Sequence, residues 1–221
     1  MKAEYFENMD YETIELDEMT QIFENKKTYS RLSVPSANEN IDFFYKKGYV
    51  LVDRTLEVKV PLTRNKTDFE KMVRLDIERT VGCREEIAKI AMESFKEDNR
   101  FQILNQKDLY GKILDQWLKK MKEAFVCIYK GEIVGFAEIT EEDTDTPFIH
   151  LAATDEKYRL TGAGMSLYAY CADYYKKEGK RALTGRISSR NVAVMNLYTS
   201  LGGQISKPWD IFAKRVSTCN E

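Results

Sequence analysis

The second half of the chain alternates short apolar runs with stretches in which apolar residues recur at helical spacing. Apolar runs predict strands, and apolar residues three and four positions apart predict helices. The predicted order is strand, two helices, two or three antiparallel strands, a glycine turn, helix, strand, helix and strand. The ranges are 72–77, 84–96, 107–121, 125–129, 132–140 and 148–153, then a helix carrying Leu167 and Tyr175, then 181–188, 191–201 and a strand through Trp209 and Phe212.

A similar but shorter series begins the chain. Its predicted elements are a strand at 31–36, a helix at 38–47 closed by Gly48, and a final strand carried by the runs 48–52 and 55–60. The same order occurs near the carboxyl end, where Gly202 closes the helix. The segment 61–71 between the two series is charged and polar, which favours a linker. The sequence therefore predicts two domains, residues 1–62 and residues 71–216.

The two series are related by their apolar positions. When their closing glycines are aligned, Phe44 stands opposite Tyr198, and Ala37 stands opposite Asn191. The first series keeps the apolar character and lacks both polar residues. We interpret residues 1–62 as an incomplete internal repeat, a half domain that packs against the second domain and does no chemistry. A chance match is the alternative, because strand–helix–strand units are common.

Gly162 and Gly164 lie where the predicted strand at 148–153 turns into a helix. The first N–H groups of a helix lack internal partners and the helix dipole is positive there, so a phosphate suits this turn. Two known phosphate loops are excluded, because Gly164 is followed by Met165 instead of Lys, and Leu167 occupies the third small position of a dinucleotide fingerprint. A turn that needs glycine only for its shape is the alternative.

Two motifs resemble those of the GNAT superfamily of N-acetyltransferases. The stretch Arg159-x-x-Gly-x-Gly is similar to the superfamily's pyrophosphate loop. Downstream, Asn191 stands seven residues before Tyr198, which stands four residues before Gly202, and this resembles the second motif of the superfamily. Val194 departs from the alanine that is usual there, which slightly reduces the room beside the cofactor.

The resemblance implies the fold, the cofactor and a set of binding residues. The fold is α/β of the α+β kind, with a mixed, mostly antiparallel central sheet flanked by helices, and here an incomplete GNAT-like half domain precedes it. The cofactor is acetyl-CoA, and the activity is transfer of the acetyl group to a primary amine by direct attack. The residues implied for cofactor binding are Ala152, Ala153, Thr154, Arg159, Leu160, Thr161, Gly162, Ala163, Gly164, Asn191, Asn196 and Tyr198.

Three side chains are candidates for proton transfer. Tyr198 is the expected general acid, because a phenol is protonated at neutral pH and can protonate the departing thiolate; packing at a helix face is its alternative role. Glu138 interrupts an apolar strand, and His150 lies on the next strand, so either can be the base. An outward-facing Glu138 and a hydrogen-bonded core His150 are the alternatives. A backbone N–H near Ala153 or Thr154 is expected to face the thioester oxygen.

A narrower resemblance concerns the acceptor. Asn99-Arg100-Phe101, between two predicted helices, together with Tyr110 and Trp117, is similar to the dTDP-fucosamine acetyltransferases. Arg100 and Phe101 are therefore expected to bind the substrate, an amino sugar or a nucleotide-linked amino sugar. The alternatives are another small amine, a peptide or protein N-terminus, or a non-catalytic protein that binds acetyl-CoA. The last would typically lose the tyrosine of the second motif, which this chain keeps.

The composition of the chain narrows the classes of function and partner that remain. The 221 residues are 43% hydrophobic, ample for a packed core, and the net charge of −2 comes without a basic stripe. The four cysteines lie far apart and the single histidine excludes a His-based metal cluster, so we expect free thiols in a reducing compartment. No apolar run reaches the roughly 18 residues of a membrane span, and the start lacks a signal peptide's apolar core. We expect a cytoplasmic protein whose partner is a small-molecule amine acceptor, without metal, nucleic acid or membrane, and we leave homodimer formation open.

Overall fold

The computed structural model describes residues 2–5, 11–16, 27, 29–36, 41–81, 84–96, 107–141, 143 and 145–215. Its strands are β1 (Lys2–Tyr5), β2 (Tyr11–Glu15), β3 (Tyr29–Pro35), β4 (Val50–Pro61), β5 (Asp76–Thr80), β6 (Ala124–Tyr129), β7 (Glu132–Thr140), β8 (Phe148–Thr154), β9 (Ala182–Ser188) and β10 (Gln204–Arg215). Its α-helices are α1 (Ile41–Lys46), α2 (Arg84–Phe95), α4 (Lys107–Lys120), α5 (Ala163–Lys177) and α6 (Val192–Ser200), and its short 3-10 helices are η1 (Glu70–Met72) and η2 (Glu156–Thr161).

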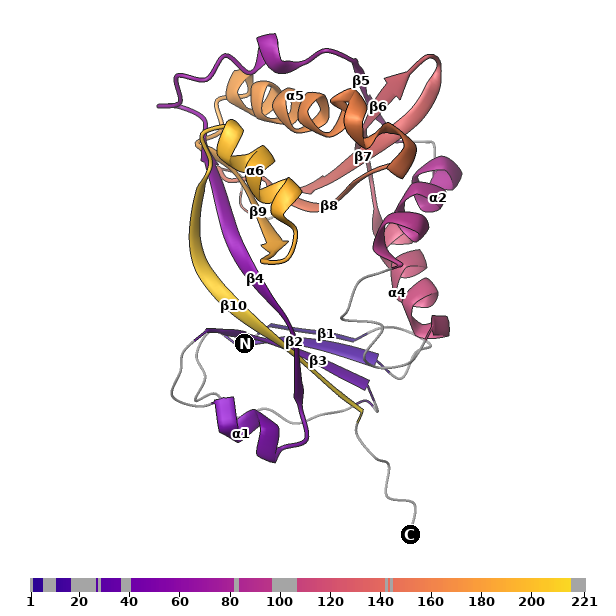
Figure 1. Cartoon of the computed structure of the whole chain (residues 1–221), viewed down its shortest axis with the longest axis vertical. Helices are drawn as coiled ribbons and strands as arrows, with labels where there is room; N and C mark the ends of the chain where they lie inside the picture. The colour runs from indigo at the N-terminus through magenta and orange to yellow at the C-terminus, as the bar shows by residue number, and fades with distance from the viewer. Residues whose placement is uncertain are drawn as a thin grey trace.

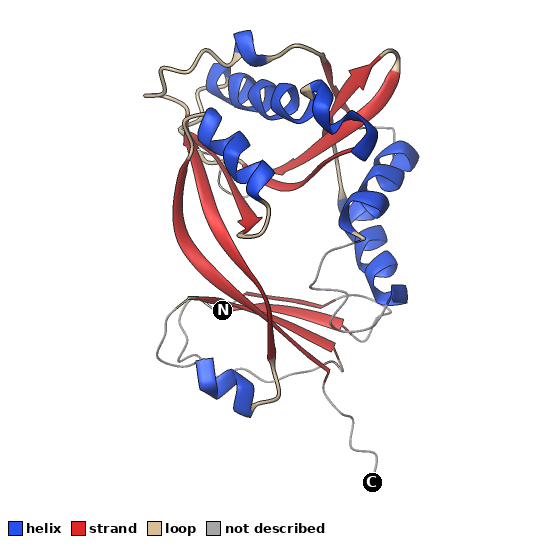
Figure 2. Cartoon of the chain, in the orientation of Figure 1, coloured by secondary structure: helices blue, strands red, loops and turns tan. Residues whose placement is uncertain are grey.

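These strands form one sheet in the order β1-β2-β3-β10-β4-β9-β8-β7-β6-β5 (Figure 1). Neighbouring strands run antiparallel except for the pairs β2–β3 and β8–β9, which run parallel. Helices flank the sheet (Figure 2). The mixed, mostly antiparallel sheet with flanking helices, expected from the sequence, is confirmed.

The two faces of the sheet carry different helices. α5 and α6 pack on one face, in a core that includes Phe125 and Cys127. α2 and α4 pack on the other face, in a core that includes Ala124 and Val126. Successive residues of a strand point to opposite faces, so the alternation along β6 separates the two cores. We call these faces the α5 face and the α4 face.

The strand order is symmetric about the β4–β10 pair. β9, β8 and β7 follow on one side and β3, β2 and β1 on the other, and each side contains one parallel pair at the matching place. α1 corresponds to α6, and both helices are followed by a glycine of positive φ, Gly48 at 80° and Gly202 at 73°. Phe44 and Tyr198, aligned in the sequence, are both buried. Ala37 lies outside the described residues.

The two sides differ in the connection between their parallel strands. Residues 155–181, which include η2 and α5, join β8 to β9, whereas residues 16–28 join β2 to β3 and are roughly half as many. The larger, carboxyl-terminal side therefore carries the glycine turn.

The segment predicted as a linker is packed into the structure. Leu62 and Phe69 are buried in the core beneath α5. Asn65 donates through Nδ2 to the Leu201 carbonyl at 2.8 Å and accepts from the Thr67 N–H at 2.9 Å. β10, from the end of the chain, lies between β3 and β4. The division into residues 1–62 and 71–216 stays a prediction.

The structure corrects one strand and adds two. The strand expected at 72–77 is instead η1 followed by irregular chain, and β5 starts at Asp76. The apolar residues of this run pack against the α5 core, but the Arg74 N–H donates to the Ser166 hydroxyl at 3.0 Å instead of to a strand. β1 and β2 were not predicted. No helix in the described ranges is both long and apolar enough to span a bilayer.

Candidate active site

β8 and β9 form a fork. They pair only through Phe148 with Thr184 and Ile149 with Gly185. Beyond these pairs β8 runs on to Thr154 beside β7, and β9 runs on to Ser188 beside β4. The facing backbone edges of the two diverging strands are therefore left without a strand partner, and unpaired edges of this kind are ready to hydrogen-bond an inserted chain.

Tyr198 lies at the base of this fork. It is 1% exposed, and its ring meets that of Tyr168 edge to face at 5.3 Å between centroids. A Cβ built on Gly185 would lie closer to the Tyr198 hydroxyl than van der Waals contact allows. Gly185 thus makes room for the phenol against β9. Burial is the main cause that raises the pKa of Tyr198 well above its usual value.

Glu138 and His150, the two candidate bases, contact each other. In the β7–β8 ladder Glu138 pairs with Leu151 and Ile139 with Ile149, so His150 is the extra residue of a β-bulge. Glu138 Oε2 lies 2.7 Å from His150 Nδ1. If the carboxylate is ionised it only accepts, and the bond then requires Nδ1 to donate, which in a neutral imidazole leaves Nε2 as an acceptor. Glu138 is 8% exposed, which excludes the outward-facing alternative.

His150 faces α4. Its ring lies 5.8 Å from that of Trp117, edge to face, and the Arg31 guanidinium lies 5.8 Å from the centroid of the same indole. The His150 side chain is 36% exposed, so it is accessible and is not a core imidazole. Trp117 therefore borders the candidate base, whereas Tyr110 ties α4 to α2 through its hydroxyl, 2.8 Å from the Met92 carbonyl.

The glycine turn leads into α5. η2 begins after Asp155, whose side chain accepts from the Lys157 N–H at 2.9 Å, and Gly162 follows η2 with φ of 83°. The first bond of the helix runs from the Ser166 N–H to the Gly162 carbonyl at 2.9 Å. The preceding amides of the helix point from its positive end without an intrahelical partner. These features favour an anion at the turn, and binding of the pyrophosphate here stays a prediction.

The two glycines of the turn act differently. Gly162 adopts a left-handed conformation that L-residues rarely take, so the backbone itself requires it. A Cβ on Gly164 would lie 3.5 Å from Thr154 Oγ1 and 3.6 Å from Leu197 Cδ1, which are ordinary contacts. The protein therefore leaves room for a Cβ at Gly164.

The other cofactor-binding candidates are spread around the turn and α6. Arg159 is half exposed, 3.9 Å from Glu156, and Leu160 is fully exposed. Asn191 caps α6 by accepting from the Val194 N–H at 3.1 Å through Oδ1, which leaves Nδ2 for a ligand. Their role in binding stays a prediction, as it does for Asn196, on the exposed side of α6, and for the β8 end at 152–154.

Two predicted substrate residues are not placed. Arg100 and Phe101 lie outside the described residues. Sequence reasoning missed Gly185, although a glycine inside a strand signals a close approach by another group. It also missed Glu15, Glu57 and Arg186, because ion pairs between distant strands leave no local pattern.

The model of the acetyltransferase (GNAT) family matches residues 84–202, more than half of the chain. A putative GNAT acetyltransferase from Novosphingobium aromaticivorans has a TM-score of 0.58 at 13% identity, with 86% of this chain and 75% of that chain covered. A GCN5-related N-acetyltransferase from Sphaerobacter thermophilus has a TM-score of 0.56 at 16% identity, with 84% and 59% covered.

A tandem GNAT protein from the clavulanic acid biosynthesis pathway is also similar. Its TM-score is 0.54 at 12% identity, with 85% of this chain and 64% of that chain covered. Among proteins of curated function, none matches with significance. At these identities the solved structures establish the shared fold, and the GNAT fold expected from the two motifs is confirmed.

Proposed function

Because the chain belongs to the acetyltransferase (GNAT) family, we propose that it acetylates a primary amine at the fork between β8 and β9. It is a GNAT-type N-acetyltransferase, and its acetyl donor is acetyl-CoA. The observation that carries the proposed site is the fork itself, which Tyr198 borders from the α5 face and His150 from the α4 face. Tyr198 contacts Gly185, and His150 directly follows Ile149, which pairs with Gly185.

Two features of the chain fit acetyl-CoA. The amides at the start of α5 suit the pyrophosphate, because they combine unpaired N–H groups with the positive end of the helix. The unpaired edges of β8 and β9 suit an extended, amide-containing arm such as pantetheine. When bound, acetyl-CoA supplies a thioester that an amine can attack. Residues 159–164 and the β8 end at 152–154 would hold it, with Asn191 at the start of α6.

The proton movements follow from the two side-chain groups. Glu138 orients His150 through Nδ1, and Nε2 takes the proton from the acceptor amine, either directly or through water. Tyr198 holds a proton at its phenol oxygen for the departing sulfur. The raised pKa of Tyr198 keeps the phenol protonated at neutral pH.

The amino-terminal residues are proposed to play a structural part. Residues 1–62 form a GNAT-like half domain without chemistry of its own, which completes the sheet of residues 71–216. The symmetric strand order about β4–β10, the burial of Phe44 at the place of Tyr198 and the short connection at 16–28 support this.

The proposed acceptor is an amino sugar or a nucleotide-linked amino sugar, in keeping with the layout similar to the dTDP-fucosamine acetyltransferases. Trp117, one of the residues of that resemblance, borders His150. The test is consumption of the acetyl-CoA thioester across nucleotide-linked amino sugars, polyamines, aminoglycosides and peptides. We expect turnover with at least one amine class, and turnover with none of them, while CoA binds, would reduce the protein to a non-catalytic binder.

A further inference from the structure

Three buried polar atoms lack a hydrogen-bond partner within the described ranges. They are Arg31 Nη1, Thr55 Oγ1 and Arg186 Nε, from three different strands, β3, β4 and β9. The two guanidinium nitrogens can only donate, and the hydroxyl can donate or accept. A buried donor without an acceptor costs stability, so each of these atoms calls for a further group that offers oxygen.

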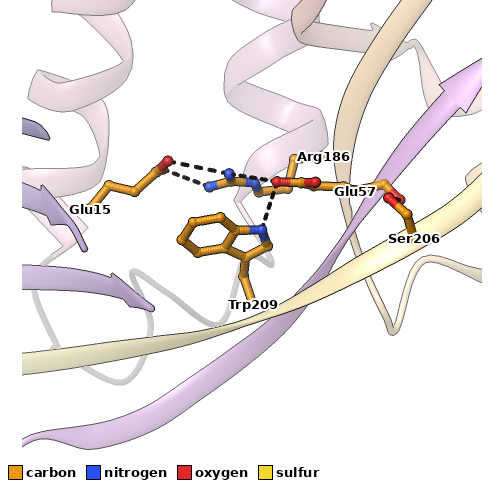
Figure 3. Close-up of polar contacts among 5 residues, drawn as sticks. All are labelled: Glu15, Glu57, Arg186, Ser206 and Trp209. Carbon is orange, nitrogen blue, oxygen red and sulfur yellow. Dashed lines mark hydrogen bonds and ion pairs between the residues drawn. The ribbon is translucent and has the colours of Figure 1, made fainter. Parts of the chain in front are cut away.

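The other nitrogens of Arg186 hold it beside the fork (Figure 3). Nη1 donates to Glu15 Oε2 at 2.7 Å, and Nη2 donates to Glu57 Oε1 at 3.4 Å. The guanidinium lies 4.3 Å from the centroid of the Trp209 ring, and Trp209 Nε1 donates to Glu57 Oε1 at 2.8 Å. The guanidinium is therefore fixed by the protein, and its Nε is left for another partner.

Arg186 and Thr55 both point to the α4 face. Arg186 follows Gly185, whose missing side chain faces Tyr198, so alternation along β9 turns Arg186 to the opposite side of the sheet. Thr55 lies two residues before Glu57 on β4, so these two side chains share a face, and Glu57 meets Arg186 there. Thr55 is 3% exposed, which shields its unused hydroxyl from solvent.

Arg31 brings the third donor to this face from the amino-terminal half domain. Its guanidinium lies 5.8 Å from the centroid of the Trp117 indole on α4, and the ring of His150 also lies 5.8 Å from that indole. Within the described ranges no carboxylate forms an ion pair with Arg31. Trp117 therefore borders both the candidate base and a cation without a counter-ion.

The sheet curls to bring the half domain over this face. β3, β10 and β4 separate β2 from β9. Four strand spacings amount to on the order of 19 Å in a flat sheet. The contact of 2.7 Å between Glu15 and Arg186 therefore shows that β2 bends over the α4 face toward β9. Arg31 reaches Trp117 from the neighbouring strand, so the half domain contributes side chains beside the fork.

Charges of both signs gather on this face. They are Arg31, Arg186, Lys207, Glu15, Glu57, Asp53 and Glu138. The unused donors, and not the net charge, therefore indicate the ligand. Two carboxylates already pair with Arg186, so its Nε suits an uncharged oxygen such as a hydroxyl. Arg31 suits an anionic oxygen, because a charge-assisted hydrogen bond is about twice as strong as a neutral one.

We propose that the α4 face beside the fork is the acceptor subsite and that it takes primary amines carrying an anionic oxygen group, a carboxylate or a phosphate. The inference rests on the proposed function and narrows its acceptor. Arg31 Nη1 donates to the anionic group, while the amine to be acetylated lies at His150 beside the same indole. Thr55 and Arg186 Nε bind uncharged oxygens of the acceptor. Arg31 is thus a specificity-determining residue that the half domain supplies.

The test compares three amino sugars with the full chain: glucosamine, which has no anionic group, its carboxylate glucosaminate, and glucosamine 6-phosphate. We expect a higher kcat/KM for an anionic sugar than for glucosamine, and the better of the two identifies carboxylate or phosphate as the group bound. Arg31→Gln should raise the KM for that sugar roughly ten- to a hundredfold, the effect of one charge-assisted hydrogen bond, and leave kcat nearly unchanged. The KM for glucosamine should change little. Arg31→Lys, which keeps the charge, should recover part of the loss.

Arg64→Gln is the matched control. Arg64 is exposed in the chain after β4, so this variant makes the same change in net charge and should leave all three KM values unchanged. The affinity for CoA, measured by calorimetry, should be the same in Arg31→Gln as in the wild type, which shows that the variant is folded.

The outcomes separate the subsite from the proposed function. Highest kcat/KM for glucosamine, or an equal effect of Arg31→Gln on all three sugars, would overturn the subsite while the acetyltransferase activity stands, and water would then satisfy the free donors. Calorimetric titration of the CoA complex with the anionic sugars tests binding apart from chemistry. Affinity that depends on Arg31 without any acetylation would support the subsite and contradict the proposed function. Absence of both would overturn the subsite as well.

Discussion

Tyr198 is deeply buried and lies at the fork, so a single substitution can test the role of its phenol proton. The Tyr198→Phe variant keeps the ring and its contact with Tyr168 but removes the proton. We expect kcat to fall roughly 10²- to 10⁴-fold, the usual contribution of a general acid. The affinity for CoA, measured by calorimetry, should persist. Rates must be compared at saturating amine, so that a binding defect is not mistaken for a chemical one.

The pH profile supplies the control for this residue. Because burial raises the pKa of Tyr198 above 10, the phenol stays protonated below that pH, and the wild-type rate should not fall there through its loss. An alkaline limb with a midpoint below pH 10 that disappears in Tyr198→Phe would contradict the raised pKa. Near-normal kcat in the variant would make Tyr198 a packing residue.

The contact between Gly185 and Tyr198 can be tested as a pair. A Cβ at Gly185 would overlap the Tyr198 hydroxyl, while the nearest ring carbon stays at 3.4 Å. Gly185→Ala should therefore destabilise the fold by about 1–3 kcal/mol, as overpacking does, and by clearly less when combined with Tyr198→Phe. Denaturant unfolding of the four proteins gives the coupling energy. Additive effects would show that the hydroxyl is not seated against β9.

At the scale of elements, the two glycines of the turn are needed for different reasons: we expect the backbone to require Gly162 and the ligand to require Gly164. Gly162→Ala should cost about 1–2 kcal/mol of stability because it forces an alanine into a left-handed conformation. Gly164→Ala should fold normally, since its Cβ has room. Gly164→Val should weaken CoA binding roughly tenfold or more in calorimetric titration, because the larger side chain keeps phosphate oxygens from the amides. Unchanged affinity in folded Gly164→Val would rule out this phosphate site.

Elements with a persistent local period could be predicted, and elements defined by their neighbours could not. β7 spans the predicted 132–140, because apolar residues mark most of its length and Glu138 interrupts them only once. β2 lies in a polar stretch and is a strand because β3 pairs with it in parallel. The same limit applies to the site. The motifs indicated Tyr198, but the contact of Glu138 with His150 depends on a bulge, which is a property of two strands together.

At the scale of the whole molecule, the burial of ionisable groups links stability to pH. Burial raises the pKa of Cys127 from 9.0 to about 11, and it also raises the pKa values of Cys171, Tyr168 and Tyr175. The folded state prefers the neutral forms, so this stability is present below the unfolded pKa values and is lost as the pH rises above them. Calorimetry should show a steady Tm from pH 7 to about 8.5 and a decline above about pH 9. A Tm that stays level beyond pH 10 would contradict this.

The position of β10 decides whether the carboxyl-terminal part can fold alone. β10 lies between β3 and β4, and residues 55–61 of β4 pair with β9 along the whole of β9. Removal of residues 1–62 therefore takes away both neighbours of β10 and one neighbour of β9. We expect this fragment to lack a cooperative unfolding transition and to lose CoA binding. Removal of residues 1–16 is the matched deletion, because it takes β1 and β2 from the edge of the sheet and leaves the β3–β10–β4 pairing intact. This shorter deletion should unfold cooperatively at a lower Tm and still bind CoA in calorimetry. Cooperative unfolding of the 63–221 fragment with CoA affinity intact would instead make residues 1–62 a dispensable, separate domain.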